Sequence, residues 1–281
     1  MSERYKYNRE GYLNENFRMF HLRDTAGQER DFHFHEFDKI VILISGSVNY
    51  MVEGTDYTLE PWDILLVRHH MIHKALIDMS VPYERIIIYI DSAYVERFAP
   101  EGGLMDCFAE AEKRRFCLMR PDRGEIEKLK DSLDRLESSI SDTEFGAELM
   151  RGTLLAQLMV QLNRIMQRDT SSKAAPTEQS GKISAALSYI NENLTSSLSV
   201  DELAAMCYLS RYHFMRLFKQ QTGCTVHNYI RQKRLVLAAR LIREGMSASS
   251  AAAECGFTDY SAFHRAFSQT FGISPGKIKS S

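Results

Sequence analysis

One pattern of residues occurs twice near the C-terminal end of this 281-residue chain, and the repeat limits the fold more than any other feature. When the sequence is shifted by 49 residues, "YLSRYHFMRLFKQQTG" falls on "FTDYSAFHRAFSQTFG". The shift pairs Tyr208 with Phe257, Ser210 with Asp259, Phe214 with Phe263, Arg216 with Arg265, Phe218 with Phe267 and Gly223 with Gly272. Self-similarity at a fixed spacing predicts one structural unit that is used twice.

The repeated unit has the signals of two short helices joined by a tight turn. Ser199, followed three residues later by Glu202, predicts a capping box and a helix to about Cys207. Ser210 then predicts the cap of a second helix that runs to about Thr222. Glycine directly afterwards is a common helix terminator. Helix, short turn and helix together predict a helix-turn-helix motif.

The second helix of each unit has an apolar face and an exposed face when residues are placed 100° apart. The apolar face holds Phe214, Leu217 and Phe218 in the first copy and Phe263, Ala266 and Phe267 in the second. The exposed face holds Tyr212, Arg216 and Lys219 in the first copy and Ser261, Arg265 and Ser268 in the second. We expect the phenylalanines to be core residues that carry no functional signal.

An exposed arginine in the middle of such a helix suits the DNA major groove, because its guanidinium can donate to both acceptors of guanine. One exposed arginine is ordinarily only solvated, but two equivalent ones on repeated helices favour DNA binding. We expect base contacts from the residues nearest the start of each helix, Tyr212, Arg216, Ser261 and Arg265. Lys219 and Ser268 are expected to contact phosphates.

The charge distribution agrees with a polyanionic partner for the C-terminal part. Residues 182–281 hold 12 Lys+Arg and 6 Asp+Glu, a net charge of +6, whereas the first 181 residues hold 23 and 31, a net charge of −8. A basic domain joined to an acidic one is typical of a protein in which only one domain meets nucleic acid.

The earlier two-thirds of the chain divides by its hydrophobic period. Residues 1–120 contain short apolar runs separated by turn signals, which predict a β-sandwich or small barrel. Residues 123–168 predict two amphipathic helices, with stripes at Ile126, Leu129, Leu133, Leu136 and Ile140 and at Leu155, Leu158, Leu162 and Ile165. These stripes either pack on the β-domain or form a dimer seam. Residues 169–181 are small and polar, as in a linker.

The remaining composition argues against a membrane or secreted protein. The longest purely apolar runs, "IVILI" and "IIIYI", are far too short to span a bilayer, and the N-terminus has no signal-peptide core. Five cysteines without a C-x-x-C pair fit the reducing cytoplasm.

The segment 198–279 resembles the C-terminal domain of the AraC/XylS transcription regulators. The resemblance lies in "SLSVDELAAMCYLSRYHFMRLFKQQTG", "YIRQKRLVLAARLI" and "AAAECGFTDYSAFHRAFSQTFGISPGKIK". It implies seven helices, two of which enter successive turns of the major groove, and a long joining helix from near Tyr229. It also implies phosphate contacts by Lys277 and Lys279. The chain departs from the family at Ala248 and Ala251, where large aliphatic residues are usual.

The front of the chain resembles the two sequence motifs of cupin barrels. These are "FHFHEFDKIVILISGS" and "LEPWDILLVRHHMIH", which contain His33, His35 and His73. Metal-binding cupins carry a glutamate where this chain has Lys39, and Trp62 and Arg68 replace the usual glycine and proline. We interpret six residues as the lining of an effector pocket: His33, His35, Lys39, Tyr50, His73 and Tyr89. One alternative is that the three histidines are paired within the barrel, and another is that His33, His35 and His73 hold Zn²⁺, Fe²⁺ or Ni²⁺.

Together these features predict an α+β multidomain protein with a cupin-like β-barrel and an all-α double helix-turn-helix domain. The expected parts are a sensing domain (1–122), helices for dimerisation (123–168), a linker (169–181) and a DNA-binding domain (182–281). The expected function is a cytoplasmic, homodimeric transcription regulator, favoured as an activator, that binds double-stranded DNA, an unknown small-molecule effector and RNA polymerase. No catalysis, cofactor or membrane contact is expected. The rivals are a metal-dependent cupin enzyme fused to a DNA-binding domain, and an effector-free protein whose front domain only dimerises.

Overall fold

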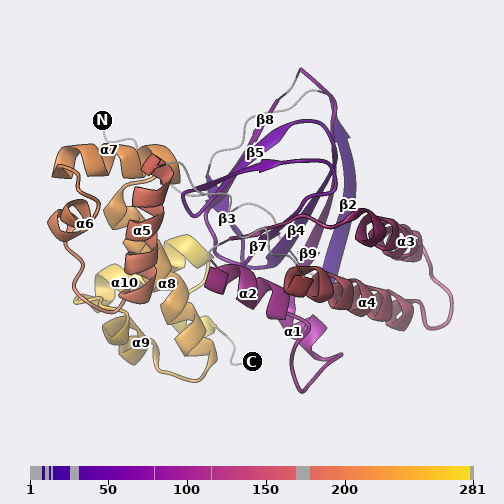
Figure 1. Cartoon of the computed structure of the whole chain (residues 1–281). Coiled ribbons are helices and arrows are strands. Elements are labelled where there is room, and N and C mark those ends of the chain that lie inside the picture. The colour runs from indigo at the N-terminus through magenta and orange to yellow at the C-terminus, as the bar shows by residue number, and fades with distance from the viewer. Residues whose placement is uncertain are drawn as a thin grey trace. The chain divides into compact units, whose positions relative to one another are not determined.

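The computed structural model describes residues 8–9, 13, 15–25, 32–78, 80–114, 116–168 and 178–278. The chain forms two compact units, one built mainly from residues 10–175 and the other mainly from residues 176–281 (Figure 1). The first unit is rich in strands and the second is helical, as the sequence predicts.

The strands of the first part of the chain are short and antiparallel wherever their pairing is described. Their bounds are β1 Asn8–Arg9, β2 Phe17–Asp24, β3 His33–Phe34, β4 Asp38–Ser45, β5 Val48–Val52, β6 Thr55–Leu59, β7 Ile64–Val67, β8 His73–Ile77, β9 Tyr83–Ile90 and β10 Leu118–Met119. Strands β3, β8, β5 and β6 are neighbours in that order in one sheet, and β10, β7, β4, β9 and β2 in the other. The predicted cupin-like β-domain is confirmed as two antiparallel sheets.

Burial of β4 on both faces explains why its sequence is apolar without alternation. Ile40 and Ile42 belong to a core cluster shared with the helices of this unit, whereas Val41 and Leu43 belong to a second cluster shared with β5, β6 and β7. Successive side chains of a strand point to opposite faces, so both faces of β4 are buried. A strand buried on both faces reads as a continuous hydrophobic run.

Four helices follow or cover the second sheet: α1 Ser92–Glu96, α2 Asp106–Arg114, α3 Arg123–Ile140 and α4 Ala147–Arg168. The α3 helix begins with a capping box, in which Asp122 accepts from Glu125 N at 2.8 Å and Glu125 accepts from Asp122 N at 2.9 Å. Leu129, Leu133 and Leu136 of the α3 stripe and the whole α4 stripe lie in the same core cluster as Ile40 and Ile88 of the sheet, whereas Ile126 is only partly buried. The buried residues of both stripes therefore pack within this unit. Ile140, the last residue of the α3 stripe, is exposed.

The second unit consists of α5 Glu178–Glu192, α6 Val200–Met206, α7 Arg211–Thr222, α8 Val226–Arg243, α9 Ala248–Glu254, α10 Tyr260–Phe271 and a single 3₁₀ turn, η1 Pro275–Lys277. Six of the seven expected helices are α5 to α10, and within the described residues the seventh is only the 3₁₀ turn η1. The α5 helix begins at Glu178, so the last four residues of the predicted linker (178–181) are helical. Residues 169–177 and Lys279 lie outside the described residues. No helix in the described part of the chain has the length and apolarity to cross a membrane.

The two helix-turn-helix motifs do not repeat at a single spacing. The first helices begin after Ser199 and Ser247, which are 48 residues apart, whereas the recognition helices begin after Ser210 and Asp259, which are 49 apart. The second turn is therefore one residue longer. The predicted pairing of Tyr208 with Phe257 is wrong. The residue equivalent to Tyr208 (φ 55°) is Gly256 (φ 76°), since both follow the helix C-cap in the left-handed region.

Two local predictions at helix starts also need correction. Ser199 caps α6 by accepting from Asp201 N at 3.2 Å, and this bond takes the place of the expected bond to the third residue of a capping box. The joining helix α8 begins at Val226, three residues before Tyr229, because Thr225 caps it by accepting from Asn228 N at 3.3 Å.

Candidate DNA-binding surface and effector site

The first recognition helix, α7, is fixed at both ends by the residues that the sequence singled out. Ser210 accepts from His213 N at 3.4 Å at its start, and Gly223 ends it with φ 76°. Phe214, Leu217 and Phe218 are buried in the unit. The opposite face presents Tyr212, which is 80% exposed, together with Arg216 and Lys219, which are also exposed.

The second recognition helix, α10, is built in the same way. Asp259 accepts from Ser261 N at 2.9 Å, and Gly272 ends the helix with φ 74°. Ser261 and Arg265 are exposed over the buried rings of Phe263 and Phe267. The two helices therefore present arginines at equivalent positions.

Ser268 does not lie on the exposed face as expected. Its hydroxyl oxygen is buried, although the residue as a whole is partly exposed. Ser268 lies on the flank of α10, about 100° from the centre of the apolar face. At the equivalent place a long lysine, Lys219, reaches solvent, whereas a short serine does not. A phosphate contact by Ser268 is therefore not available in this conformation, while Lys277 is exposed in η1.

The joining helix α8 packs on both motifs. Near its start, the Tyr229 ring lies 5.6 Å from the Phe218 ring of α7. Its second half contributes Leu235, Ala238, Ala239 and Ile242 to a cluster with α9 and α10. The unusual Ala251 is fully buried in that cluster, so the small residues of α9 take part in close packing.

The β-rich unit brings the three predicted histidines together. His33 of β3 pairs with His73 of β8 across the strands, and His35 lies two residues further along the chain. The three ring centroids are 4.4–5.1 Å apart and all three side chains are buried. Each ring offers a nitrogen, and these nitrogens lie within 4.8 Å of one another.

Lys39 approaches the same cluster from the facing sheet. Its Nζ lies 3.4 Å from His73 Nε2, and His73 Nδ1 lies 2.9 Å from the carbonyl oxygen of Met71. The carbonyl can only accept, so Nδ1 carries the proton and Nε2 accepts from the ammonium. Burial, together with the charge of Lys39, holds the pKa of His73 well below its usual value of 6.5. The ring is therefore neutral at pH 7.

Both predicted tyrosines join this cluster. The Tyr50 ring lies 6.0 Å from Lys39 Nζ, and Tyr89, the cross-strand partner of Lys39, has its ring 5.7 Å from His35. All six residues expected to line the effector pocket thus meet at one place between the two sheets. The sequence analysis did not predict two aromatic neighbours of this cluster, Phe37 and Tyr83. The Phe37 ring centroid lies 4.2 Å from that of Tyr89, and the Tyr83 hydroxyl lies 3.4 Å from the Tyr50 hydroxyl. The alternation of Tyr83, Arg85, Ile87 and Tyr89 along β9 was a signal for Tyr83.

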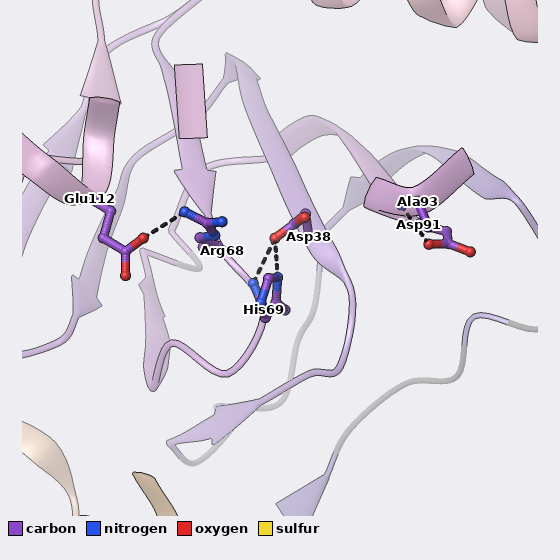
Figure 2. A network of polar contacts seen from close by, with 6 residues as sticks. All are labelled: Asp38, Arg68, His69, Asp91, Ala93 and Glu112. Atoms are coloured by element: carbon purple, nitrogen blue, oxygen red, sulfur yellow. Dashed lines mark hydrogen bonds and ion pairs between the residues drawn. The ribbon is translucent and has the colours of Figure 1, made fainter. Parts of the chain in front are cut away.

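A second set of polar contacts holds the segment between β7 and β8, which contains Arg68 and His69 (Figure 2). Buried Asp38 accepts from His69 N at 2.8 Å and from its Nδ1 at 2.9 Å. Arg68, where proline is usual in cupins, pairs with Glu112 of α2 at 2.6 Å. Figure 2 also shows Asp91, which caps α1 by accepting from Ala93 N at 3.0 Å. The contacts of Asp38 and Glu112 fix the segment that leads into His73.

Trp62, the other departure from the cupin pattern, shows why glycine is usual there. Its φ is 73°, in the left-handed region that favours glycine. Its backbone N donates to Leu43 O at 2.6 Å, and its ring packs against the core cluster of the sheet and helices. Packing of the large ring offsets the backbone strain, which is on the order of 1 kcal/mol.

Among the described residues, His33, His35 and His73 form the group that could hold a metal ion, but the neighbouring ammonium of Lys39 does not suit one. A tetrahedral Zn²⁺ site needs ligand nitrogens about 3.3 Å apart, since each Zn–N bond is about 2.0–2.1 Å. The ammonium of Lys39 lies against one of the three ligand nitrogens, where it opposes a second cation. The positive charge of Lys39 therefore disfavours a metal ion at this cluster.

Comparison with known proteins agrees with the description of the β-rich unit and of the helical unit. Residues 19–159 match the AraC-like ligand binding domain, and residues 203–281 match a helix-turn-helix domain. The chain therefore belongs to the AraC family of transcription regulators, and it is a DNA-binding transcription regulator.

Two curated relatives cover nearly all of the chain. The transcriptional activator RhaS of Klebsiella pneumoniae (strain 342) is 25% identical over 88% of this chain and 86% of its own length. The probable transcriptional regulator LumQ of Photobacterium leiognathi is 26% identical over 91% of this chain and 94% of its own length. A crystal structure of the DNA-binding domain of AdpA with a target DNA is 30% identical over 33% of this chain and 84% of that one, with a TM-score of 0.32.

Proposed function

We propose that this regulator is an effector-responsive activator whose α7 and α10 helices read two short DNA elements in successive turns of the major groove. The observation that carries this proposal is the pair of exposed arginines, Arg216 and Arg265, at equivalent places on two capped helices. Tyr212 and Ser261 lie nearer the helix starts and reach base edges. Lys219 and Lys277 bind phosphates.

The sensing part of the proposal rests on the cluster around Lys39. A buried ammonium with a neutral imidazole and tyrosine hydroxyls beside it favours an effector that carries a carboxylate or another anionic group. Residues 1–122 form the sensing domain in this scheme, 123–168 the dimerisation helices, 169–181 the linker and 182–281 the DNA-binding domain. The effector acts by preferring one arrangement of the protein and shifting its population.

The regulator acts on chromosomal promoters in the cytoplasm and contacts RNA polymerase there. It has no catalytic activity in this scheme, because Lys39 opposes the metal that a cupin enzyme would need. The similarity to the activator RhaS supports activation rather than repression.

Selection from a random DNA library with the full-length protein tests the proposed readout. We expect the enriched duplexes to hold two short elements about 10 bp apart, one helical turn. Affinity for them should fall steeply as salt rises, since binding releases counterions. Enrichment of a single element, or of no sequence at all, would contradict the proposal.

We further propose that the protein forms a homodimer through the end of the α3–α4 hairpin. Four exposed apolar residues gather there in sequence: Ile140, Phe145, Leu149 and Met150 are 41%, 108%, 67% and 54% exposed. Single exposed apolar residues are ordinary, but four within eleven positions at one hairpin end favour a protein contact.

Changing Phe145→Ser together with Leu149→Ser should convert the dimer to a monomer. The two side chains lose their apolar burial at the contact, while the buried stripes of both helices stay intact. Analytical ultracentrifugation of the full chain measures the mass. Val81→Ser, which changes another exposed apolar residue of the same unit, is the control and should remain dimeric. A doubly substituted protein that sediments as a dimer would place the contact elsewhere.

A further inference from the structure

A groove of about 470 Å³ lies within the helical unit, away from the faces of the two recognition helices that were singled out above. Its lining comes from three places: the segment between α5 and α6, the α8 helix and the turn between α9 and α10. The lining residues are Thr195, Ser196, Ser197, Leu198, His227, Ile230, Arg231, Arg234, Gly256, Phe257 and Thr258. This lining combines two arginines, a histidine and four hydroxyls, and it includes no carboxylate.

Arg234 holds the three walls of the groove together. From the middle of α8, its Nε donates to Leu194 O at 2.8 Å and its Nη2 to Ser196 O at 2.7 Å. Its Nη1 donates to Gly256 O at 3.0 Å. The guanidinium therefore joins the segment before the first helix-turn-helix motif to the turn of the second.

Gly256 is required for this arrangement. A Cβ at this position would lie 2.9 Å from the Arg234 Cζ, and its φ of 76° is strained for other residues. Tyr208 occupies the equivalent position of the first turn with a similar φ, but there it is 91% exposed. The glycine of the second turn is thus explained by the approach of Arg234, and the groove is a built feature of the unit.

The position of the groove points to its occupant. Ser197 and Leu198 precede Ser199, the N-cap of the first helix of the first motif, and Thr258 precedes Asp259, the N-cap of the second recognition helix. In helix-turn-helix complexes the first helix crosses the DNA backbone and the start of the recognition helix enters the major groove. The groove therefore lies between two places that approach DNA.

We propose that this groove binds the phosphodiester backbone of the DNA strand that runs between the two major-groove segments. Arg231 and His227 donate to the phosphate oxygens, together with the hydroxyls of the lining, as side chains of these types do at DNA backbones. Arg234 is a positioning residue, because its guanidinium donates to three backbone carbonyl groups, while its positive charge still favours an anion in the groove. The inference rests on the proposed function, since it assumes two major-groove contacts.

Arg231→Ala in the full-length protein is the first test, with a selected two-element duplex as the probe. Loss of one phosphate contact should weaken binding about tenfold for all sequences and lower the salt slope by about one. Arg240→Ala is the matched control, because it removes one exposed positive charge from the same helix outside the groove lining. It should stay within about twofold of the wild type. Equal effects of the two changes would overturn the assignment.

A neutral methylphosphonate, placed in turn at each phosphate between the two elements, gives the sharper test. The wild type should lose affinity about tenfold at one or two positions, and Arg231→Ala should be insensitive at those same positions. If no central phosphate shows this coupling, the groove does not hold the DNA backbone. A failure to select any two-element duplex would instead defeat the proposed function itself.

The last arm separates DNA from a free anion as the source of phosphate. Inorganic phosphate is titrated into the DNA-free protein while its thermal unfolding is followed. We expect no shift in melting temperature up to about 1 mM. A shift that Arg231→Ala abolishes, without methylphosphonate coupling, would assign the groove to a free anion and overturn the proposal.

Discussion

Replacing Arg216 with alanine is expected to weaken binding to the selected two-element DNA by about 10- to 100-fold and to remove the preference for one base pair. The guanidinium is exposed on α7, opposite the buried Phe214 and Phe218. A bidentate contact of this kind discriminates against the wrong base by about 1–3 kcal/mol. Titration of the variant against duplexes that carry each of the four base pairs at every position of one element measures the loss.

Lys219→Ala is the matched control for this change. Lys219 is on the same helix and also exposed, but it lies nearer the helix end, where contacts go to the backbone. Its removal should weaken all sequences similarly and reduce the salt slope by about one, with base preferences unchanged. If both variants lose discrimination equally, or if only Lys219→Ala does, the assigned faces of α7 are wrong.

The recognition helices were predictable because their signals are local. Ser210 and Asp259 are polar caps directly before apolar repeats, and Gly223 and Gly272 adopt the left-handed conformation directly after them. Each of these residues acts on a backbone group within four positions of itself, so the sequence alone carries the information. The same locality explains why Thr225, a cap directly before α8, was a readable signal that was missed.

The register of the second turn was not predictable from the repeat, because this turn contains one residue more than the first and its glycine meets a distant side chain. Gly256 leaves no room for a Cβ, because the guanidinium of Arg234, 22 residues earlier in the chain, would lie 2.9 Å from it and donates to the carbonyl oxygen of the glycine. A shift of the sequence by a constant spacing cannot reveal the one additional residue that this turn contains. Alignment of the helix caps, rather than of the aromatic residues alone, reveals it.

The amphipathic helices illustrate a second limit of sequence reasoning. Periodicity shows that Leu129, Leu133 and Leu136 share a face, but it does not show what covers that face. In the structure these leucines belong to a core cluster that contains both the α4 helix and the sheet, with Ile40 and Ile88 among its members. The proposed dimer contact therefore moves to the hairpin end, where Phe145 lies outside any helical period.

The sequence predicted which residues form the effector cluster, but it did not predict the hydrogen bonds and protonation states within it. Two histidines two residues apart share a strand face, and cupin-like motifs bring a third beside them. The donation from Lys39 to His73 depends on how two sheets face each other, which the sequence does not state. Burial and, after it, the charge of Lys39 hold the pKa of His73 low, and the same charge opposes a metal ion.

Changing His35→Ala together with His73→Ala should abolish the response to effector while leaving operator affinity within about tenfold, or about 1.4 kcal/mol. The two rings lie 4.6 Å apart beside Lys39 in the β-rich unit, whereas Arg216 and Arg265 belong to the other compact unit. Removal of the rings takes away the acceptor of the Lys39 ammonium and the wall of the site, so ligand contacts are lost. The measurements are a reporter assay with effector, found by thermal-shift screening of metabolites, and operator binding without it.

Melting temperature decides between loss of sensing and loss of packing in this variant. His73 is fully buried, so alanine there leaves a cavity that destabilises the fold. If the variant unfolds for this reason, it loses DNA binding and the response to effector together. His21→Ala is the control, because His21 pairs with Glu84 and Glu137 and stands apart from the cluster. It should keep a normal response. If the His35→Ala, His73→Ala protein is stable and still responds to effector, the sensing site lies elsewhere in the chain. If it melts early and also loses operator binding, the two histidines only pack.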